Sequence, residues 1–256
     1  MKEPQAEKWI RPFSMGNEFI NSIPRYCLWL VDIAPNELAK LPEVLKRVEA
    51  VKKMRLASKA ASTRKFAEKP AIFCQLAQPD TDYLAIPKVS SETRRFIPIG
   101  YLDKQVISGD KLFTIANATL YHFGILTSTM HNAWMRSVCG RMKSDYSYSN
   151  TIVYNNFPFP TPTEKQIKSI EEKAQAVLDA RAVHENSTLA DLYNPLTMPA
   201  NLVKAHNELD KAVDSAYNYK GSKDDAARVA FLFEKYQELV APLVEIEKVK
   251  TRKVKK

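Results

Sequence analysis

The sequence lacks the residue patterns that many catalytic and metal-binding proteins share. Its three cysteines, Cys27, Cys74 and Cys139, are far apart and form no CxxC pair, and its four histidines form no HExxH pattern. This spacing argues against the common structural zinc motifs. No GxGxxG, GxxxxGK[ST] or GxSxG motif occurs either, so the sequence offers no dinucleotide-binding loop, no P-loop and no nucleophile elbow.

Long apolar segments are also missing. No run of about 18 apolar residues is present, and the N-terminus shows no charged segment followed by an apolar one. We therefore expect a soluble protein that does not enter a membrane, and three unpaired cysteines fit the reducing cytoplasm. With 256 residues, 45% of them hydrophobic, the chain is long enough for one large domain or two modest ones.

The charge is unevenly distributed along the chain. Residues 1–160 hold 22 Lys/Arg against 14 Asp/Glu, whereas residues 161–247 hold 10 against 15, and residues 248–256 hold six bases and no acid. A basic first part beside an acidic second part indicates two domains with different roles. Basic surfaces attract polyanions through counterion release, which makes nucleic acid the leading partner class. A generic basic surface is the alternative.

The pattern of apolar residues predicts an α+β fold: a small, mostly antiparallel β unit with packed helices over residues 1–160. The segments RYCLWLVDI, AIFCQL, YLAIPKV, RRFIPIGYL, KQVIS and KLFTI read as short strands. Residues 42–69 predict a helical region that begins at Pro42 and carries a row of lysines and arginines. That row is either a solvated face or a phosphate-contacting surface. Residues 118–139 predict one buried helix capped by Gly140.

An all-α domain is expected over residues 161–247. Thr163 and Gln166 have the spacing of a capping box at the start of a helix, and helical patterns recur over 199–218 and 223–246. We expect the basic tail 248–256 to be disordered. Asn194-Pro195-Leu196-Thr197 is close to the Asn/Asp-Pro-Pro-aromatic loop of amino-group DNA methyltransferases but lacks the stacking aromatic, so it predicts a structural turn. No catalytic residue is assigned.

The stretch GRMKSDYSYSNTIVYNNFPFP, residues 140–160, is the strongest functional signal. If the segment is extended, Lys143 and Asp145 point the same way. Lysine donates to guanine O6 and N7 and aspartate accepts from cytosine N4, so the pair matches the major-groove edge of one G·C pair. A local ion pair is the alternative. Tyr146, Ser147 and Tyr148 add donors for bases or phosphates, and TIVYNNFPFP predicts a closing strand with a rigid exit.

Five blocks of the sequence together resemble one known family. They are RPFSMGNEFINSIPRYCLWLVD, VEAVKKMRLASK, PKVSSETRRFIPIGYL, the long segment from Asn117 to Pro160, and LADLYNPLTMPANLVKAHNELDKAVDSAY followed by ARVAFLFEKYQEL. They resemble the target recognition domain and C-terminal helical domain of the MmeI-like (Type IIL) DNA methyltransferases. These are single-chain restriction-modification enzymes that methylate adenine.

The resemblance implies roles for particular residues. The position of Lys143 and Asp145 reads one base pair in this family, and a Lys/Asp pair implies guanine on the read strand. Ser147 stands where such proteins commonly have Arg, so a base contact there is in question. The loop at Asp110-Lys111 is a further position of specificity, with Lys111 as its base-reading candidate.

The remaining expectations concern the DNA backbone, the cofactor and the partners. Candidate backbone contacts, chosen on charge or hydroxyl grounds, are Arg94, Arg95, Arg136, Arg141, Tyr146 and Tyr148. The resemblance places the S-adenosylmethionine pocket and the catalytic residues in a domain N-terminal to this segment, so no cofactor and no metal are expected in this chain. Duplex DNA and that methyltransferase domain of the same parent chain are the expected partners. A protein-interaction module and an RNA-binding module are the alternatives.

Overall fold

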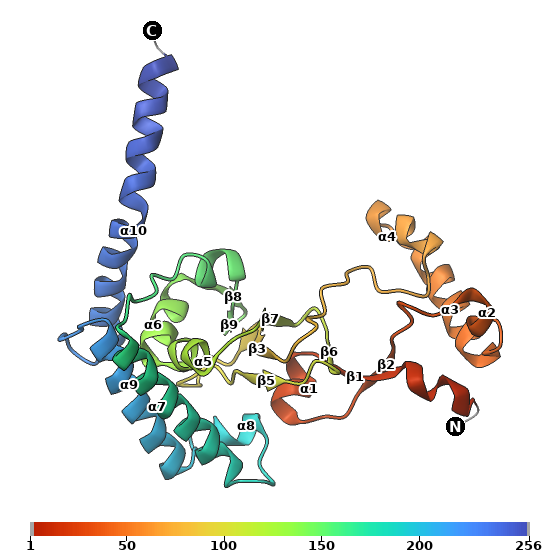
Figure 1. Cartoon of the computed structure of the whole chain (residues 1–256), viewed down its shortest axis with the longest axis horizontal. Helices are drawn as coiled ribbons and strands as arrows, with labels where there is room; N and C mark the ends of the chain where they lie inside the picture. The colour runs from red at the N-terminus through yellow and green to blue at the C-terminus, as the bar shows by residue number, and fades with distance from the viewer. Residues whose placement is uncertain (1–2, 255–256) are drawn as a thin grey trace.

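The computed structural model describes residues 3–254, with side chains described as far as Pro242. It confirms the predicted α+β class, with small sheets followed by a helical region. Figure 1 shows an elongated molecule with an N-terminal helical lobe at one end, the strands in the middle and the C-terminal helices at the other end. Within the described residues, no helix is both long and apolar enough to span a membrane.

The N-terminal lobe has its own small core. Its elements are η1 (Pro4–Trp9), α2 (Pro35–Leu38), α3 (Pro42–Leu56), α4 (Ala61–Lys65) and η2 (Phe66–Glu68). Its buried apolar residues are Ala6, Leu30, Leu41, Val44 and Val48. Pro42 occupies the first turn of α3, as predicted, and the Glu3 carboxylate accepts hydrogen bonds from the amides of Glu43 and Val44. Glu3 therefore caps α3, whose own N-cap position has no polar side chain.

The middle of the molecule consists of three small sheets. Their strand orders are β2 (Tyr26–Leu28), β1 (Ile10–Ser14), β6 (Ile107–Ser108); β5 (Gly100–Leu102), β3 (Tyr83–Pro87), β7 (Leu112–Ala116); and β4 (Val89–Ser90), β9 (Asp145–Ser147), β8 (Gly140–Met142). All pairings are antiparallel except β1 with β6. Strand β3 is buried along its whole length, and the short helix α1 (Gly16–Asn21) packs beside it.

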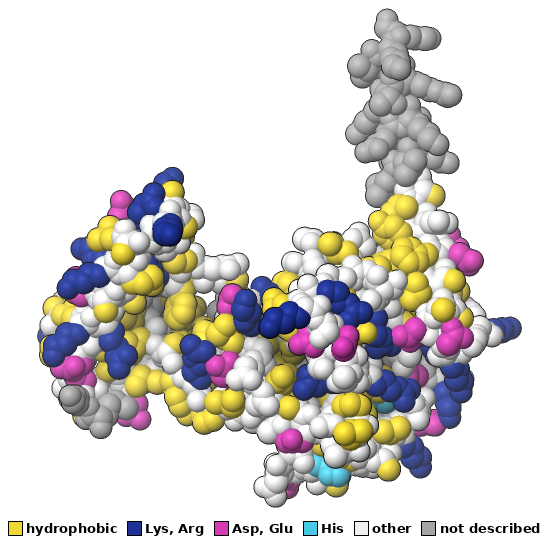
Figure 2. Space-filling view, turned by 180° about the vertical axis from the view of Figure 1, so that it is seen from behind, with side chains coloured by type: hydrophobic (Ala, Val, Ile, Leu, Met, Phe, Trp, Pro, Cys, Tyr) yellow, Lys and Arg dark blue, Asp and Glu magenta, His cyan; other side chains and the backbone are white. Residues whose placement is uncertain are grey.

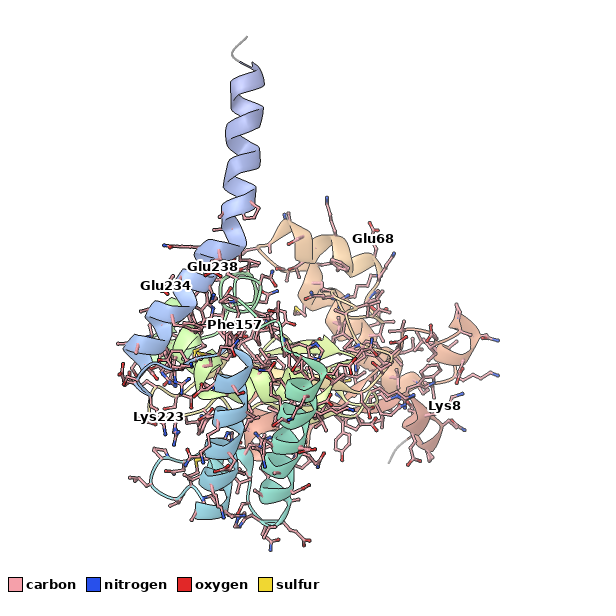
Figure 3. The ribbon with its side chains drawn as sticks, turned by 60° about the vertical axis from the view of Figure 1, so that its left-hand side comes forward. Lys8, Glu68, Phe157, Lys223, Glu234 and Glu238 are labelled. Carbon is pink, nitrogen blue, oxygen red and sulfur yellow. The ribbon has the colours of Figure 1, made fainter. Side chains whose placement is uncertain are left out.

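The helices of the second half pack on the sheets and on one another. They are α5 (Leu120–Thr127), α6 (Thr129–Val138), α7 (Glu164–Ala182), α8 (Leu189–Leu192), α9 (Ala200–Ala216) and α10 (Asp225–Val254). Thr163 and Gln166 form the predicted capping box at the start of α7. One continuous core joins β3 to these helices, and Figure 3 shows its member Phe157 in the interior near the lower part of α10.

Several predicted elements are wrong. The helix expected over 118–139 is broken at Ser128, whose φ and ψ of −69° and 158° are extended, and Gly140 begins β8 instead of capping a helix. The segment AIFCQL forms no strand. TIVYNNFPFP begins as a π-helical turn, η3 (Asn150–Tyr154), and not as a closing strand. Finally, α10 continues to Val254, so 248–254 is helical, and residues 255–256 lie outside the described residues.

The close packing of α5 against α7 and α9 depends on Gly124. A Cβ at this position would lie 2.6 Å from Ile170 Cγ2 and 3.3 Å from both Ala174 Cβ and Leu209 Cδ1. We expect Gly124→Ala to destabilise the chain, because overpacking costs about 1–3 kcal/mol and alanine regains about 1 kcal/mol of helix propensity. Urea unfolding measures the change. The matched control is Gly140→Ala, where the nearest atoms are 3.8 Å away; equal stability of the two variants contradicts the prediction.

Candidate nucleic-acid interface

A tight β-hairpin carries the residues that the sequence singles out. Strands β8 and β9 pair antiparallel, with Met142 opposite Asp145, so the turn consists only of Lys143 and Ser144. Lys143 is exposed and has a φ of 57°, whereas Ser144 does not have a positive φ. A positive φ at the first turn residue alone is the pattern of a type II′ turn, where glycine is preferred. A lysine therefore stands at a position whose backbone costs about 1 kcal/mol or more for a residue with a side chain.

The hairpin changes the predicted relation between Lys143 and Asp145. They do not follow one another along an extended segment, because Lys143 lies in the turn and Asp145 begins β9. Asp145 and Ser147 instead share one face of β9, and Tyr146 points to the opposite face. The structure thus places Asp145 and Ser147 side by side, with Lys143 at the adjoining tip.

The two tyrosines predicted to contact the DNA backbone are buried in this structure. Arg141 lies opposite Tyr146 in the hairpin and its guanidinium carbon is 4.1 Å from the Tyr146 ring centroid. The Tyr148 hydroxyl is 3.0 Å from His131 Nε2, and burial raises the pKa of Tyr148. Both tyrosines belong to the core cluster. Their rings pack in the core and are not exposed to a ligand, and the Tyr148 hydroxyl contact with His131 joins the hairpin to α6.

Backbone hydrogen bonds connect Lys111 to the end of the hairpin through one residue, Lys88. The Lys111 carbonyl accepts a hydrogen bond from Lys88 N at 3.0 Å, and the Lys88 carbonyl accepts one from Tyr148 N at 2.8 Å. The Lys111 ammonium is exposed and 3.6 Å from Asp110. Lys88 was not predicted as a functional residue, because the segment YLAIPKV that contains it has the sequence pattern of a single strand. It stands at the break between β3 and β4, and its ammonium is 4.4 Å from the Phe113 ring centroid.

The four predicted arginine contacts have different environments. Arg141 is exposed, 3.6 Å from Glu92 at the rim of the hairpin. Arg94 is half-buried: desolvation lowers the pKa of its guanidinium, and the nearby charge of Asp145 acts in the opposite direction. Arg94 and Asp145 therefore lie within electrostatic reach of each other. The hairpin tip thus combines Lys143 and Asp145 with Arg94, whereas Arg141 lies on the face of the hairpin that carries Tyr146.

Arg136 and Arg95 make contacts with residues of α10 and α9. Arg136 donates from Nε and Nη2 to the two carboxylate oxygens of Asp225 at 2.7 and 3.0 Å, and from Nη1 to the Arg95 carbonyl. This bidentate pair joins α6 to α10 and gives the Arg136 guanidinium a partner within the protein. Arg95 donates to Asn207 Oδ1 at 3.1 Å and lies 3.7 Å from Asp210. The Arg95 guanidinium also lies over the Phe96 ring. Together these contacts orient the Arg95 side chain toward α9.

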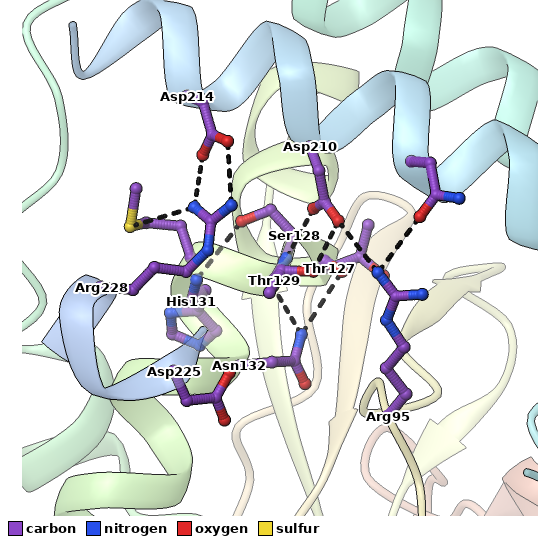
Figure 4. A network of polar contacts seen from close by, with 12 residues as sticks. Arg95, Thr127, Ser128, Thr129, His131, Asn132, Asp210, Asp214, Asp225 and Arg228 are labelled. Atoms are coloured by element: carbon purple, nitrogen blue, oxygen red, sulfur yellow. Dashed lines mark hydrogen bonds and ion pairs between the residues drawn. The ribbon is translucent and has the colours of Figure 1, made fainter. Parts of the chain in front are cut away.

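A buried carboxylate from α9 holds the start of α6, the helix that leads directly into the hairpin (Figure 4). Asp210 accepts from Thr129 N at 2.7 Å and from Thr129 Oγ1 at 2.5 Å. Ser128 Oγ caps the same helix by accepting from His131 N. Burial raises the pKa of Asp210, although the bonds from Thr129 and the positive charges of Arg95 and Arg228 act in the opposite direction. An anion at a helix N-terminus is favourable, so Asp210 fixes where α6 begins.

Family comparison assigns the two halves of this architecture. The family model described as the MmeI target recognition domain matches residues 1–161, and the model described as the MmeI C-terminal domain matches residues 162–244. The chain belongs to the MmeI family. The MmeI-like hairpin and the helices that support it are thus parts of a target recognition domain and its C-terminal companion.

Two relatives extend this assignment. DNA methyltransferase A of Bacillus subtilis (strain 168) is 37% identical over 238 residues, which is 93% of this chain and 27% of that protein. A solved structure of the Type IIL restriction-modification enzyme MmeI in complex with DNA matches with a TM-score of 0.93 and 51% identity, over 94% of this chain and 32% of that one. This MmeI family member therefore spans about a third or less of the length of both relatives.

The Asp210 contact predicts a large effect on stability. We expect Asp210→Ala to lower the free energy of unfolding by about 2–4 kcal/mol, because two hydrogen bonds to a charged group are lost and the buried Thr129 amide is left without a partner. Urea unfolding, followed by the fluorescence of buried Trp134 on α6, measures the loss. Glu208→Ala removes an exposed carboxylate from the same helix and serves as the control, and equal values for the two variants contradict this role.

Buried histidines predict a loss of stability in mild acid. Burial lowers the pKa of His131 to about 3, and the pKa of His206 is also well below its usual value because of burial. Below about pH 6.5 the unfolded chain binds protons that the folded chain does not, so each histidine costs about 1.4 kcal/mol per pH unit. We expect His131→Gln to reduce this pH dependence between pH 6.5 and 5. Urea unfolding curves recorded at each pH give the free energy of unfolding. If this free energy changes with pH by the same amount in the wild type and in His131→Gln, the prediction is wrong.

Proposed function

We propose that this chain is the part of a restriction-modification enzyme that reads the base sequence of duplex DNA, within a longer enzyme that methylates adenine at the recognised site. The observation that carries the proposal is the hairpin tip. An exposed lysine occupies a turn position that favours glycine, beside a partly exposed aspartate. A backbone cost retained at an exposed tip points to a role for the side chain itself.

The chemistry of the tip fits one G·C pair in the major groove. Lys143 donates to guanine O6 and N7, and Asp145 accepts from cytosine N4. A carboxylate repels phosphates, so Asp145 is explained by base reading better than by backbone binding. Arg141 and Arg94 lie beside this pair and supply positive charge for the phosphates that flank it. Lys111 and Ser147 remain candidate base contacts at neighbouring positions.

The methyl donor belongs to the longer enzyme. The curated relative is a DNA methyltransferase, and such enzymes generally use S-adenosylmethionine. The residues of this chain do not fit that cofactor, because none of the described glycines has a positive φ and no glycine-rich loop follows a strand. We therefore assign S-adenosylmethionine and the catalytic residues to a methyltransferase domain of the same longer chain, working in the cytoplasm. The family assignment favours this DNA-reading function over a protein-interaction or RNA-binding module.

A charge exchange at the tip tests the proposal. We expect the longer enzyme with Lys143→Glu and Asp145→Arg to methylate a motif that differs at one position, with guanine replaced there, because the donor and acceptor have traded places. Methylated-base sequencing of DNA from cells that express each enzyme gives the two motifs. The matched control exchanges the charges of an exposed ion pair on α9, away from the hairpin, with Lys211→Glu and Glu208→Lys. An unchanged motif from an active Lys143/Asp145 variant contradicts base reading by this tip.

The variant Lys143→Gly distinguishes the role of the lysine side chain from the role of the residue in the turn. Glycine adopts a positive φ without strain, so we expect the variant to be as stable as the wild type or more stable by up to about 1 kcal/mol. The same variant should methylate a motif that accepts more than one base at the position Lys143 reads. Reduced stability, or an unrelaxed motif, argues that the lysine serves only the turn.

A further inference from the structure

The N-terminal lobe concentrates positive charge that the fold does not use. Residues 42–69 hold nine Lys/Arg against three Asp/Glu, which is a net charge of +6 out of +9 for the whole chain. Five of these cations form an exposed surface on α3, α4 and the turns that follow them, called here the basic lobe surface: Lys52, Lys53, Lys59, Lys65 and Lys69. Within the described part of the chain, none of the five forms an ion pair.

Three of the other four cations of residues 42–69 have structural partners, and the fourth, Arg47, is exposed and forms no ion pair among the described residues. Lys46 pairs with Glu43 at 2.6 Å, and Arg64 donates to the carbonyls of Ser58 and Lys59. Arg55 is buried and donates to three carbonyls that follow α4 and η2, those of Phe66, Lys69 and Ile72. The basic lobe surface is therefore distinct from the cations that hold the lobe together.

The lobe presents its charges on a rigid support. It has a separate apolar core, and Arg55 fixes the returning segment against α3. Phe73 on that segment lies 5.5 Å from the Trp29 ring and 6.3 Å from the Phe13 ring of β1, as measured between centroids. These aromatic contacts attach the lobe to the sheets, so the basic lobe surface keeps a defined position relative to the hairpin.

The lobe and the hairpin lie on either side of a hollow. Figure 2 shows the molecule hollowed between the lobe and the central body, with lysines and arginines on both sides. In Figure 1, α4 and the β8–β9 hairpin lie toward the same side of the molecule. A polyanion that contacts the hairpin from this side can therefore extend toward the lobe.

The exposed residues of the lobe suit phosphates and not base edges. Around these lysines lie exposed small residues, Ala50, Ala57, Ala60, Ala61 and Ser62, and two exposed apolar side chains, Met54 and Leu56. No exposed Asn or Gln, the side chains that read adenine edges, lies between residues 42 and 69. We propose that the basic lobe surface binds the phosphate backbone of duplex DNA flanking the sequence that the hairpin reads, and contributes affinity without base preference. The choice of DNA as the polyanion rests on the proposed function.

The experiment compares Lys52→Glu/Lys53→Glu with a control of equal charge change, Lys165→Glu/Lys168→Glu, on the exposed face of α7. The motif bound by the wild-type chain is first selected from a pool of randomised duplexes. Dissociation constants are then measured between 50 and 200 mM salt on duplexes that carry this motif with short or long flanks. We expect the lobe variant to bind the long duplex about tenfold or more weakly. We also expect its salt slope to fall by about 2, since each lost phosphate contact contributes about 0.9.

The outcomes separate this inference from the proposed function. An unchanged selected motif, a loss only on the long duplex and a silent control support flank binding. Equal affinity of the lobe variant and the control on the long duplex overturns it, as does an altered motif. If no motif is selected at all, the base-reading function fails; the salt slopes of the same variants on a random duplex then still decide whether the lobe binds DNA.

Discussion

The contact between Asp210 and the start of α6 is the constraint on which the recognition domain depends. The carboxylate comes from α9 in the C-terminal half, and the amide that it accepts from belongs to the helix that runs into the hairpin. Because α5 and α6 are separate helices, α6 needs its own N-terminal cap, and a cap from a different domain fixes the helix relative to that domain. The orientation of the hairpin tip is thereby set by a residue 65 positions away from Asp145 in sequence. This makes the C-terminal helices a support for the hairpin as well as for the core.

Other contacts strengthen the same junction. Arg136 of α6 pairs with Asp225 of α10, Arg95 lies 3.7 Å from Asp210 of α9, and within the second half Arg228 of α10 pairs with Asp214 of α9. Each pair is charge-assisted and partly shielded from water, so it tolerates the loss of one partner poorly. Some of the acidic residues of the second half therefore pair with basic residues of the first half. What the sequence shows as two domains of opposite charge is, in the structure, a joint interface with complementary ions.

The sequence predicted the parts of the fold that depend on local patterns. The α+β class, the helix start at Pro42 and the capping box at Thr163 all follow from residues within one turn of each other. The break at Ser128 did not, because it depends on a contact from Asp210, distant in the sequence, in addition to the local cap by Ser128 itself. The burial of Tyr148 was missed for the same reason, since its partner His131 lies on another element. Lys143 was identified from its chemistry, whereas its place in a turn depends on the strand register.

The alternation of the hairpin separates residues that support the fold from residues that are free to change. Tyr146 and Tyr148 face the core, and their replacement would open it. Asp145 and Ser147 face the other way, and Lys143 has no side-chain partner among the described residues. A recognition domain built in this way can exchange the side chains at positions 145 and 147 at little cost in stability, because these side chains and the packed tyrosines occupy opposite faces of one strand. The proposed flank binding by a separate lobe would add to this freedom, since affinity that does not depend on bases remains when residues at the hairpin tip change.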